Sequence, residues 1–253
     1  MKILALDSSG MSASAAVAED DILKAEFTVN TGKMHSQILL PLVAAVRDQT
    51  GMDLSDIDAI AVAEGPGSFT GLRIGSATAK GLGLVWDKPI VPVPTVDGLA
   101  YNLFGTDKMV CPLMDARRNQ VYTGIYEFVS EDAEDQNTGA AGNVPGHIQM
   151  KIHQQQCVVY IEEILSKLIK LGRETVFLGD GVPVYENVIR EKMTVPYTFA
   201  PAHMNRQRAG SIAVLGAELY RKNVIQTAAG HAPIYLRMSQ AEQEAQEQKA
   251  KET

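Results

Sequence analysis

Apolar residues in the first third of the chain form short runs between polar turns, and two segments are long enough for helices. Short apolar runs indicate strands, whereas apolar positions three or four apart indicate helices. The alternation of the two predicts an α/β sheet covered by helices. The predicted strands lie at 2–6, twice within 12–29, within 56–67 and at 88–94, and the predicted helices at 33–50 and 71–86.

The same alternation starts again near residue 104. Two strands are predicted around a turn at Asp115 to Asn119, and later segments predict three helices, one of which Gly172 ends. Residues 130–143 predict an exposed loop. The chain therefore predicts two lobes and a tail: 1–103 with the helix near 207–222, 104–206, and the polar segment 239–253.

Glycine interrupts the helix predicted at 71–86, where each interior glycine costs roughly 1 kcal/mol relative to alanine. Gly71, Gly75, Ala79 and Gly83 recur every four residues and therefore share one helix face. The helix at 33–50 is apolar around most of its circumference, and such a helix must be buried on all sides. Either the two helices cover only each other and the sheet, or they bind a partner; we favour the partner.

Composition narrows the function classes. The chain has 253 residues, 45% of them hydrophobic, and 23 basic against 30 acidic residues give a net charge of −7. An acidic chain without a basic block is a poor candidate to bind nucleic acid alone. No apolar run is long enough to span a bilayer, and the first residues do not read as a signal peptide. The two cysteines suggest no disulfide framework, so we expect a cytoplasmic protein.

Three glycine-containing turns are candidate nucleotide contacts. Each has two readings, a plain turn or a loop that holds a phosphate on backbone N–H groups. The turn at 65–71 (GPGSFTG) matches neither a P-loop nor the dinucleotide fingerprint. The candidate residues are Asp7, Ser8, Ser9, Gly65, Gly67, Ser68, Gly179, Asp180 and Gly181.

Catalytic and metal signatures are lacking. The five histidines form no HxH, HxxxH or HExxH pair, and no cysteine lies at ligand spacing from them. No GxSxG motif occurs, and Cys111 lies in an apolar run typical of a core. We therefore predict no catalytic residues and no metal site.

Five segments in order resemble the TsaB (YeaZ-type) family: ILALDSS, HSQILLP, AVAEGPGSFTGLRIGSATAKGLG, PVPTVDGLA and APIYLR. The resemblance is close over residues 1–100 and looser to about 237. It implies the two-lobed actin, sugar kinase and Hsp70 (ASKHA) fold, with ribonuclease H-like sheets and flanking helices. It also implies a role in making N6-threonylcarbamoyladenosine (t6A) at position 37 of tRNAs that read ANN codons.

The resemblance also implies what this chain lacks. The catalytic relative, TsaD, holds a metal with an HxxxH pair just after the strand that matches residues 90–94. Thr95 and Leu99 stand at those two positions here, and neither can replace histidine as a ligand. The chain is therefore expected to be a non-catalytic subunit without a cofactor, apart from weak binding of ATP or ADP.

The partners implied are TsaD, an ATPase called TsaE, and a second copy of the chain in isolation, with tRNA reached only through the complex and no membrane contact. The interface residues predicted for TsaD are His35, Leu39, Leu42, Val43, Val46, Gly71, Leu72, Gly75, Ala79 and Gly83. Two alternatives remain open. One is a nucleotide-dependent phosphotransferase or hydrolase using Asp7, Ser68 and Asp180, and the other is a tRNA-binding module.

Overall fold

A computed structural model describes residues 1–20, 22–32, 34–130 and 148–237. Its first sheet has the strand order β3-β2-β1-β4-β5. The first three strands pair antiparallel, whereas β4 runs parallel to β1 and β5 parallel to β4. The strands are β1 (Lys2–Asp7), β2 (Ala13–Glu19), β3 (Ile22–Val29), β4 (Ala59–Gly65) and β5 (Ile90–Pro94).

The second sheet repeats this topology. Its order is β10-β9-β6-β7-β8. The strands that come first in the sequence, β6, β7 and β8, again pair antiparallel, and β9 and β10 run parallel to β6. A duplicated sheet of this kind is the ASKHA architecture, and the predicted fold class is confirmed. The strands are β6 (Met109–Asp115), β7 (Gln120–Ser130), β8 (Ile148–Tyr160), β9 (Thr175–Leu178) and β10 (Tyr197–Phe199).

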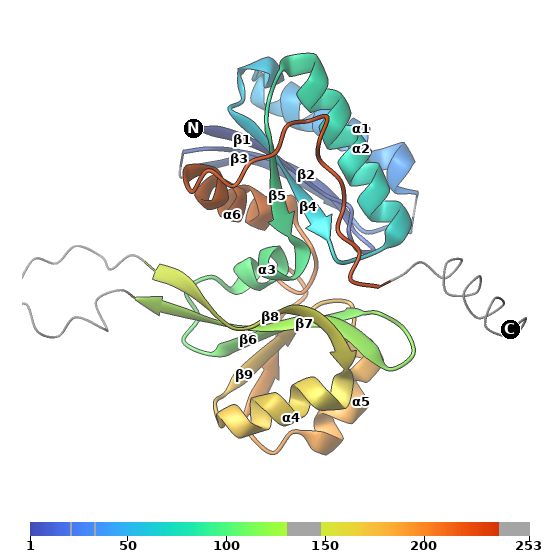
Figure 1. Cartoon of the computed structure of the whole chain (residues 1–253), viewed down its shortest axis with the longest axis vertical. Helices are drawn as coiled ribbons and strands as arrows, with labels where there is room; N and C mark the ends of the chain where they lie inside the picture. The colour runs from blue at the N-terminus through green and yellow to red at the C-terminus, as the bar shows by residue number, and fades with distance from the viewer. Residues whose placement is uncertain (21, 33, 131–147, 238–253) are drawn as a thin grey trace, which may run out of the picture.

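Helices form layers outside and between the two sheets (Figure 1). The outer face of the first sheet carries α1 (His35–Thr50) and α2 (Phe69–Trp86), and that of the second carries α4 (Ile161–Leu171) and α5 (Val182–Lys192). Between the sheets lie α3 (Thr95–Ala100) and α6 (Ala209–Arg221). Short 3₁₀ turns occupy Leu54–Asp56 and Tyr101–Leu103. No helix in the described ranges is long and apolar enough to cross a membrane.

The helix end predicted at Gly172 is confirmed, and two other helix termini have common capping residues. Gly51 ends α1 and Gly172 ends α4, both in the left-handed conformation, with φ of 63° and 68°. The Ser68 hydroxyl accepts the Gly71 N–H at the start of α2. The strand β8 was not predicted, because its residues are polar and half-exposed along much of its length. Of the loop predicted at 130–143, residue 130 ends β7 and the others lie outside the described ranges, as does the tail 239–253.

One hydrophobic cluster continues from the first sheet through α3 and α6 into the second sheet. It includes Ala61 and Val93 of the first sheet, Ile212 of α6, and Tyr126 and Leu178 of the second sheet, all essentially inaccessible to solvent. The two lobes therefore share a core, and separating them would expose these side chains to water.

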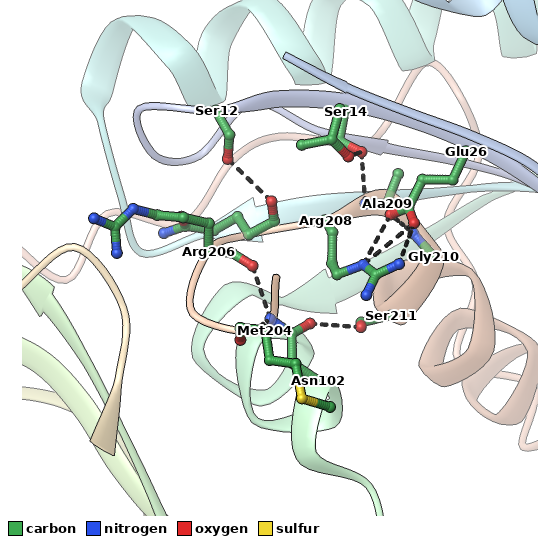
Figure 2. Close-up of polar contacts among 12 residues, drawn as sticks. Ser12, Ser14, Glu26, Asn102, Met204, Arg206, Arg208, Ala209, Gly210 and Ser211 are labelled. Atoms are coloured by element: carbon green, nitrogen blue, oxygen red, sulfur yellow. Dashed lines mark hydrogen bonds and ion pairs between the residues drawn. The ribbon is translucent and has the colours of Figure 1, made fainter. Parts of the chain in front are cut away.

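Polar contacts join the two chain segments that connect the lobes (Figure 2). The Asn102 amide nitrogen donates to the carbonyl oxygens of Met204 and Arg206 at 2.8 and 2.7 Å, and its oxygen accepts from the Ser211 hydroxyl at 2.6 Å. The Ser14 hydroxyl accepts the Ala209 N–H at the start of α6. Asn102 thus fixes the first connection against the second.

Candidate functional site

The turn after β1 is buried. Asp7 is 1% exposed, and its Oδ1 accepts the backbone N–H and the hydroxyl of Ser9 at 2.9 and 2.6 Å. Burial raises the pKa of Asp7 to about 6, against the lowering effect of the Ser9 hydrogen bonds. This carboxyl is therefore held inside the lobe by its own turn.

This turn rests directly on the first turn of α2. The Ser8 hydroxyl donates to the Gly71 carbonyl at 2.8 Å, and the Ser68 N–H donates to the Ser9 carbonyl at 2.7 Å. A Cβ atom at Gly67 or Gly71 would clash with the backbone oxygens of Ser9 or Ser8. The glycines at the start of α2 are therefore required by the close approach of two backbones within the chain.

The small-residue face of α2 continues this packing against the chain's own sheet. A Cβ atom at Gly75 would lie 2.6 Å from the Ser8 hydroxyl oxygen, and one at Gly83 would lie 2.9 Å from the Ala228 Cβ. Ala79 and Leu72 are buried as well. The prediction that Gly71, Leu72, Gly75, Ala79 and Gly83 face a partner is therefore wrong, because this face is filled from within the chain.

The residues predicted on α1 have the same outcome. Leu39, Leu42, Val43 and Val46 are buried in the cluster between α1, α2 and the first sheet. The prediction that these four face a partner is wrong, because they form the core that attaches the helix to the sheet. Of the five residues predicted on α1, His35 alone is partly accessible to solvent. Its Nε2 lies 3.4 Å from the Met11 carbonyl oxygen, and both residues line the cleft between the lobes.

The opposite face of α2 is exposed and poor in charge. Arg73, Ala77, Gly81 and Leu84 recur at helical spacing and are all exposed, with Leu84 62% and the adjoining Val85 78% accessible. On α1, Leu40 is 55% exposed. These positions were not among the predicted interface residues, although the apolar residues around most of the circumference of α1 indicated that a second face had to be covered.

A cleft of about 790 Å³ opens between the lobes. Its walls include the first turns of α1 and α2, the turn between β6 and β7, and the chain from Tyr235 to Arg237. Of the predicted nucleotide contacts, Ser9, Gly67, Ser68 and Asp180 line the cleft, whereas the remaining five do not: Asp7, Ser8, Gly65, Gly179 and Gly181.

Asp180 lies on the wall of the cleft that belongs to the second lobe, between β9 and α5. Gly179 has φ of 109°, and a Cβ atom there would clash with the Leu113 carbonyl, so the glycine is required by the fold. Burial raises the pKa of Asp180, while Arg206 lowers it. Its Oδ1 is buried, without a hydrogen-bond partner among the described residues. Asp7 is sealed in the other lobe, so the phosphotransferase constellation of Asp7, Ser68 and Asp180 does not converge on one cleft.

The positions where the resemblance places metal ligands in TsaD have structural roles here. Thr95 and Leu99 are buried, and the Thr95 hydroxyl accepts the Gly65 N–H at 3.1 Å. Nearby, burial and the Asp97 carboxyl raise the pKa of Glu64 to about 7. Among the described residues, no three His, Cys, Asp or Glu side chains gather as a metal would need.

The C-terminal segment crosses from the first lobe to the second. The Ile234 N–H donates to the Glu64 carbonyl at 2.7 Å, and the Tyr235 ring lies 4.8 Å from that of Phe69. The Arg237 guanidinium then donates to the Ala116 carbonyl, at the turn between β6 and β7. This segment, which contains the APIYLR motif of the family resemblance, forms one rim of the cleft.

Comparison with known proteins adds sequence and structural relatives. Residues 29–245 match the family model "TsaD: tRNA N6-adenosine threonylcarbamoyltransferase". The chain is 31% identical over 242 residues to the tRNA threonylcarbamoyladenosine biosynthesis protein TsaB of Bacillus subtilis, covering 96% of each chain. It is 36% identical over 129 residues to TsaB of Escherichia coli, covering 50% of this chain and 55% of that protein. The fold matches YeaZ from Pseudomonas aeruginosa with a TM-score of 0.74 at 24% identity, over 93% of this chain and 99% of that one.

Proposed function

Since the chain belongs to the TsaB family, whose members serve tRNA threonylcarbamoyladenosine biosynthesis, we propose that it is the subunit that binds and activates the TsaD-type transferase. The transferase would carry the chemistry, and this chain would hold it in an active form through α1 and α2. In isolation the same surface would join two copies of the chain. An ATPase of the TsaE type would complete the assembly, and tRNA would be bound only by the complex.

The observation that carries this proposal is the exposed apolar face of α2. Leu84 and Val85 present large aliphatic side chains to solvent, and Gly81 leaves a gap between them and Ala77 into which a partner helix could pack. Glycine at an exposed helix position weakens the isolated helix, and the fold does not require it at Gly81, because a Cβ atom there would enter open space. A close helix–helix contact would supply the reason.

The proposal also covers nucleotide binding by this chain. We propose that ATP or ADP binds only weakly, at Ser9, Gly67, Ser68 and Asp180 in the cleft. Isothermal titration calorimetry of the isolated chain tests this directly. Micromolar binding accompanied by turnover would favour the alternative of a phosphotransferase or hydrolase.

The test of the proposal is binding to the TsaD-type transferase of the same organism. Leu84→Lys places a charge on the exposed face of α2 and should weaken complex formation at least tenfold, together with t6A formation by the reconstituted enzymes. Val184→Lys is the matched control, because Val184 is 57% exposed on α5 of the other lobe. A wild-type chain that binds no transferase, or equal binding by Leu84→Lys and wild type, would refute the proposal.

A further inference from the structure

The turn between β6 and β7 is built from three successive residues in the left-handed conformation. Arg117, Arg118 and Asn119 have φ of 64°, 54° and 58°. Asparagine adopts this conformation readily, but for arginine it costs about 1 kcal/mol or more per residue. The backbone is fixed by the Asp115 carboxylate, which accepts the Arg117 N–H at 2.8 Å, and by the Gln120 N–H, which donates to the Arg117 carbonyl at 3.0 Å.

These contacts use the backbone of the turn, so glycine would satisfy them equally well. The Arg117 side chain is 86% exposed, and its Nη1 lies 3.3 Å from the Asp115 carboxylate. Because the arginine end of this ion pair is exposed to water, the pair adds little to stability. The arginine side chain therefore contributes little to the fold, although its position strains the backbone.

The location of Arg117 suggests what it recognises. The turn lines the cleft, facing the first turns of α1 and α2, where a partner lying along these helices would begin. Asp115 and Asp180 also line this cleft, and their carboxyl groups disfavour a polyphosphate there, in keeping with the weak nucleotide binding proposed above. A single carboxylate carries less negative charge than a polyphosphate and therefore meets less of this repulsion, and it can accept two parallel hydrogen bonds from a guanidinium.

We propose that Arg117 binds an acidic side chain of the transferase subunit when that subunit lies on α1 and α2. This inference rests on the proposed function and extends the interface from the helices of the first lobe to the second lobe. The Arg237 side chain, which donates to the Ala116 carbonyl, holds the turn in place from the C-terminal segment.

The test is Arg117→Gly, read by thermal melting and by transferase affinity. We expect a melting temperature equal to wild type or up to about 2 °C higher, because glycine relieves the left-handed strain. We expect transferase affinity to fall about tenfold or more, with a shallower dependence on salt. Asn223→Gly is the matched control, because Asn223 also has a left-handed φ of 59° but does not line the cleft. It should leave affinity unchanged.

Arg117→Gly that binds the transferase at wild-type strength would overturn the inference while leaving the proposed function intact. Loss of affinity for inorganic phosphate or ATP alone, with transferase binding retained, would also overturn it and assign the turn to a phosphate ligand. If Leu84→Lys and Arg117→Gly both weaken binding and Asn223→Gly does not, the inference stands. If the wild-type chain itself fails to bind, the proposed function fails and this inference falls with it.

Discussion

Two glycines on α2 separate the packing role of this helix from its proposed binding role. Gly75 faces the chain's own sheet, where its Cβ would lie 2.6 Å from the Ser8 hydroxyl oxygen and 3.6 Å from Val62 Cγ2. Gly81 faces solvent, and a Cβ atom there would meet nothing within 4 Å outside the adjoining helix backbone. The same substitution to leucine at each position therefore has opposite consequences.

For Gly81→Leu, replacing glycine inside a helix stabilises the free chain by about 0.8 kcal/mol. For a chain of this size, that corresponds to a melting temperature about 2–3 °C higher. For Gly75→Leu, the same helix gain is outweighed by overpacking, which costs about 1–3 kcal/mol, and by displacement of the Ser8 hydroxyl from Gly71. We therefore expect Gly75→Leu to melt several degrees below wild type.

The assay is differential scanning calorimetry beside titration with the TsaD-type transferase. Gly81→Leu should be the more stable variant and yet bind at least tenfold more weakly, because its side chain holds a partner helix away. Wild-type affinity in a folded Gly81→Leu protein would remove this position from the interface. A Gly75→Leu protein as stable as wild type would show that the inward face of α2 is not closely packed.

Three further predictions concern buried residues. The protonated form of Glu64 contributes stability that is fully present below about pH 4.5 and lost as the pH rises through about 7. In urea melts, the free energy of unfolding of Glu64→Gln relative to wild type should therefore be about 3 kcal/mol higher at pH 8 than below about pH 4.5. Asn102→Ala leaves two backbone carbonyls without their donor and should cost about 2–4 kcal/mol in the same melts. Metal analysis of a chelator-washed sample should find no stoichiometric zinc or iron, and peptidase assays no activity, because Thr95 and Leu99 offer no imidazole.

Most strands and helices, but not β8, and several helix ends could be predicted from the sequence, because hydrophobic period and glycine caps are local signals. The direction in which the small-residue face of α2 points could not be predicted. Periodicity shows that Gly71, Gly75 and Gly83 share a face, but a helix with apolar residues on more than one face does not reveal which face meets the sheet. The shape of the Arg117 turn was also hidden, because arginine carries no preference for a positive φ. The shared core depends on contacts between residues a hundred positions apart, which no local pattern records.

The placement of α6 sets the order in which the chain can fold during synthesis. This helix covers the inner face of the first sheet, yet 127 residues separate its end at Arg221 from the end of β5 at Pro94. At about 5–20 residues per second, a ribosome needs roughly 6–25 s to add them. The second lobe is complete before then, while Ala61 and Val93 of the first sheet still await their cover. The nascent chain therefore presents an open apolar sheet to chaperones until its last fifth has emerged.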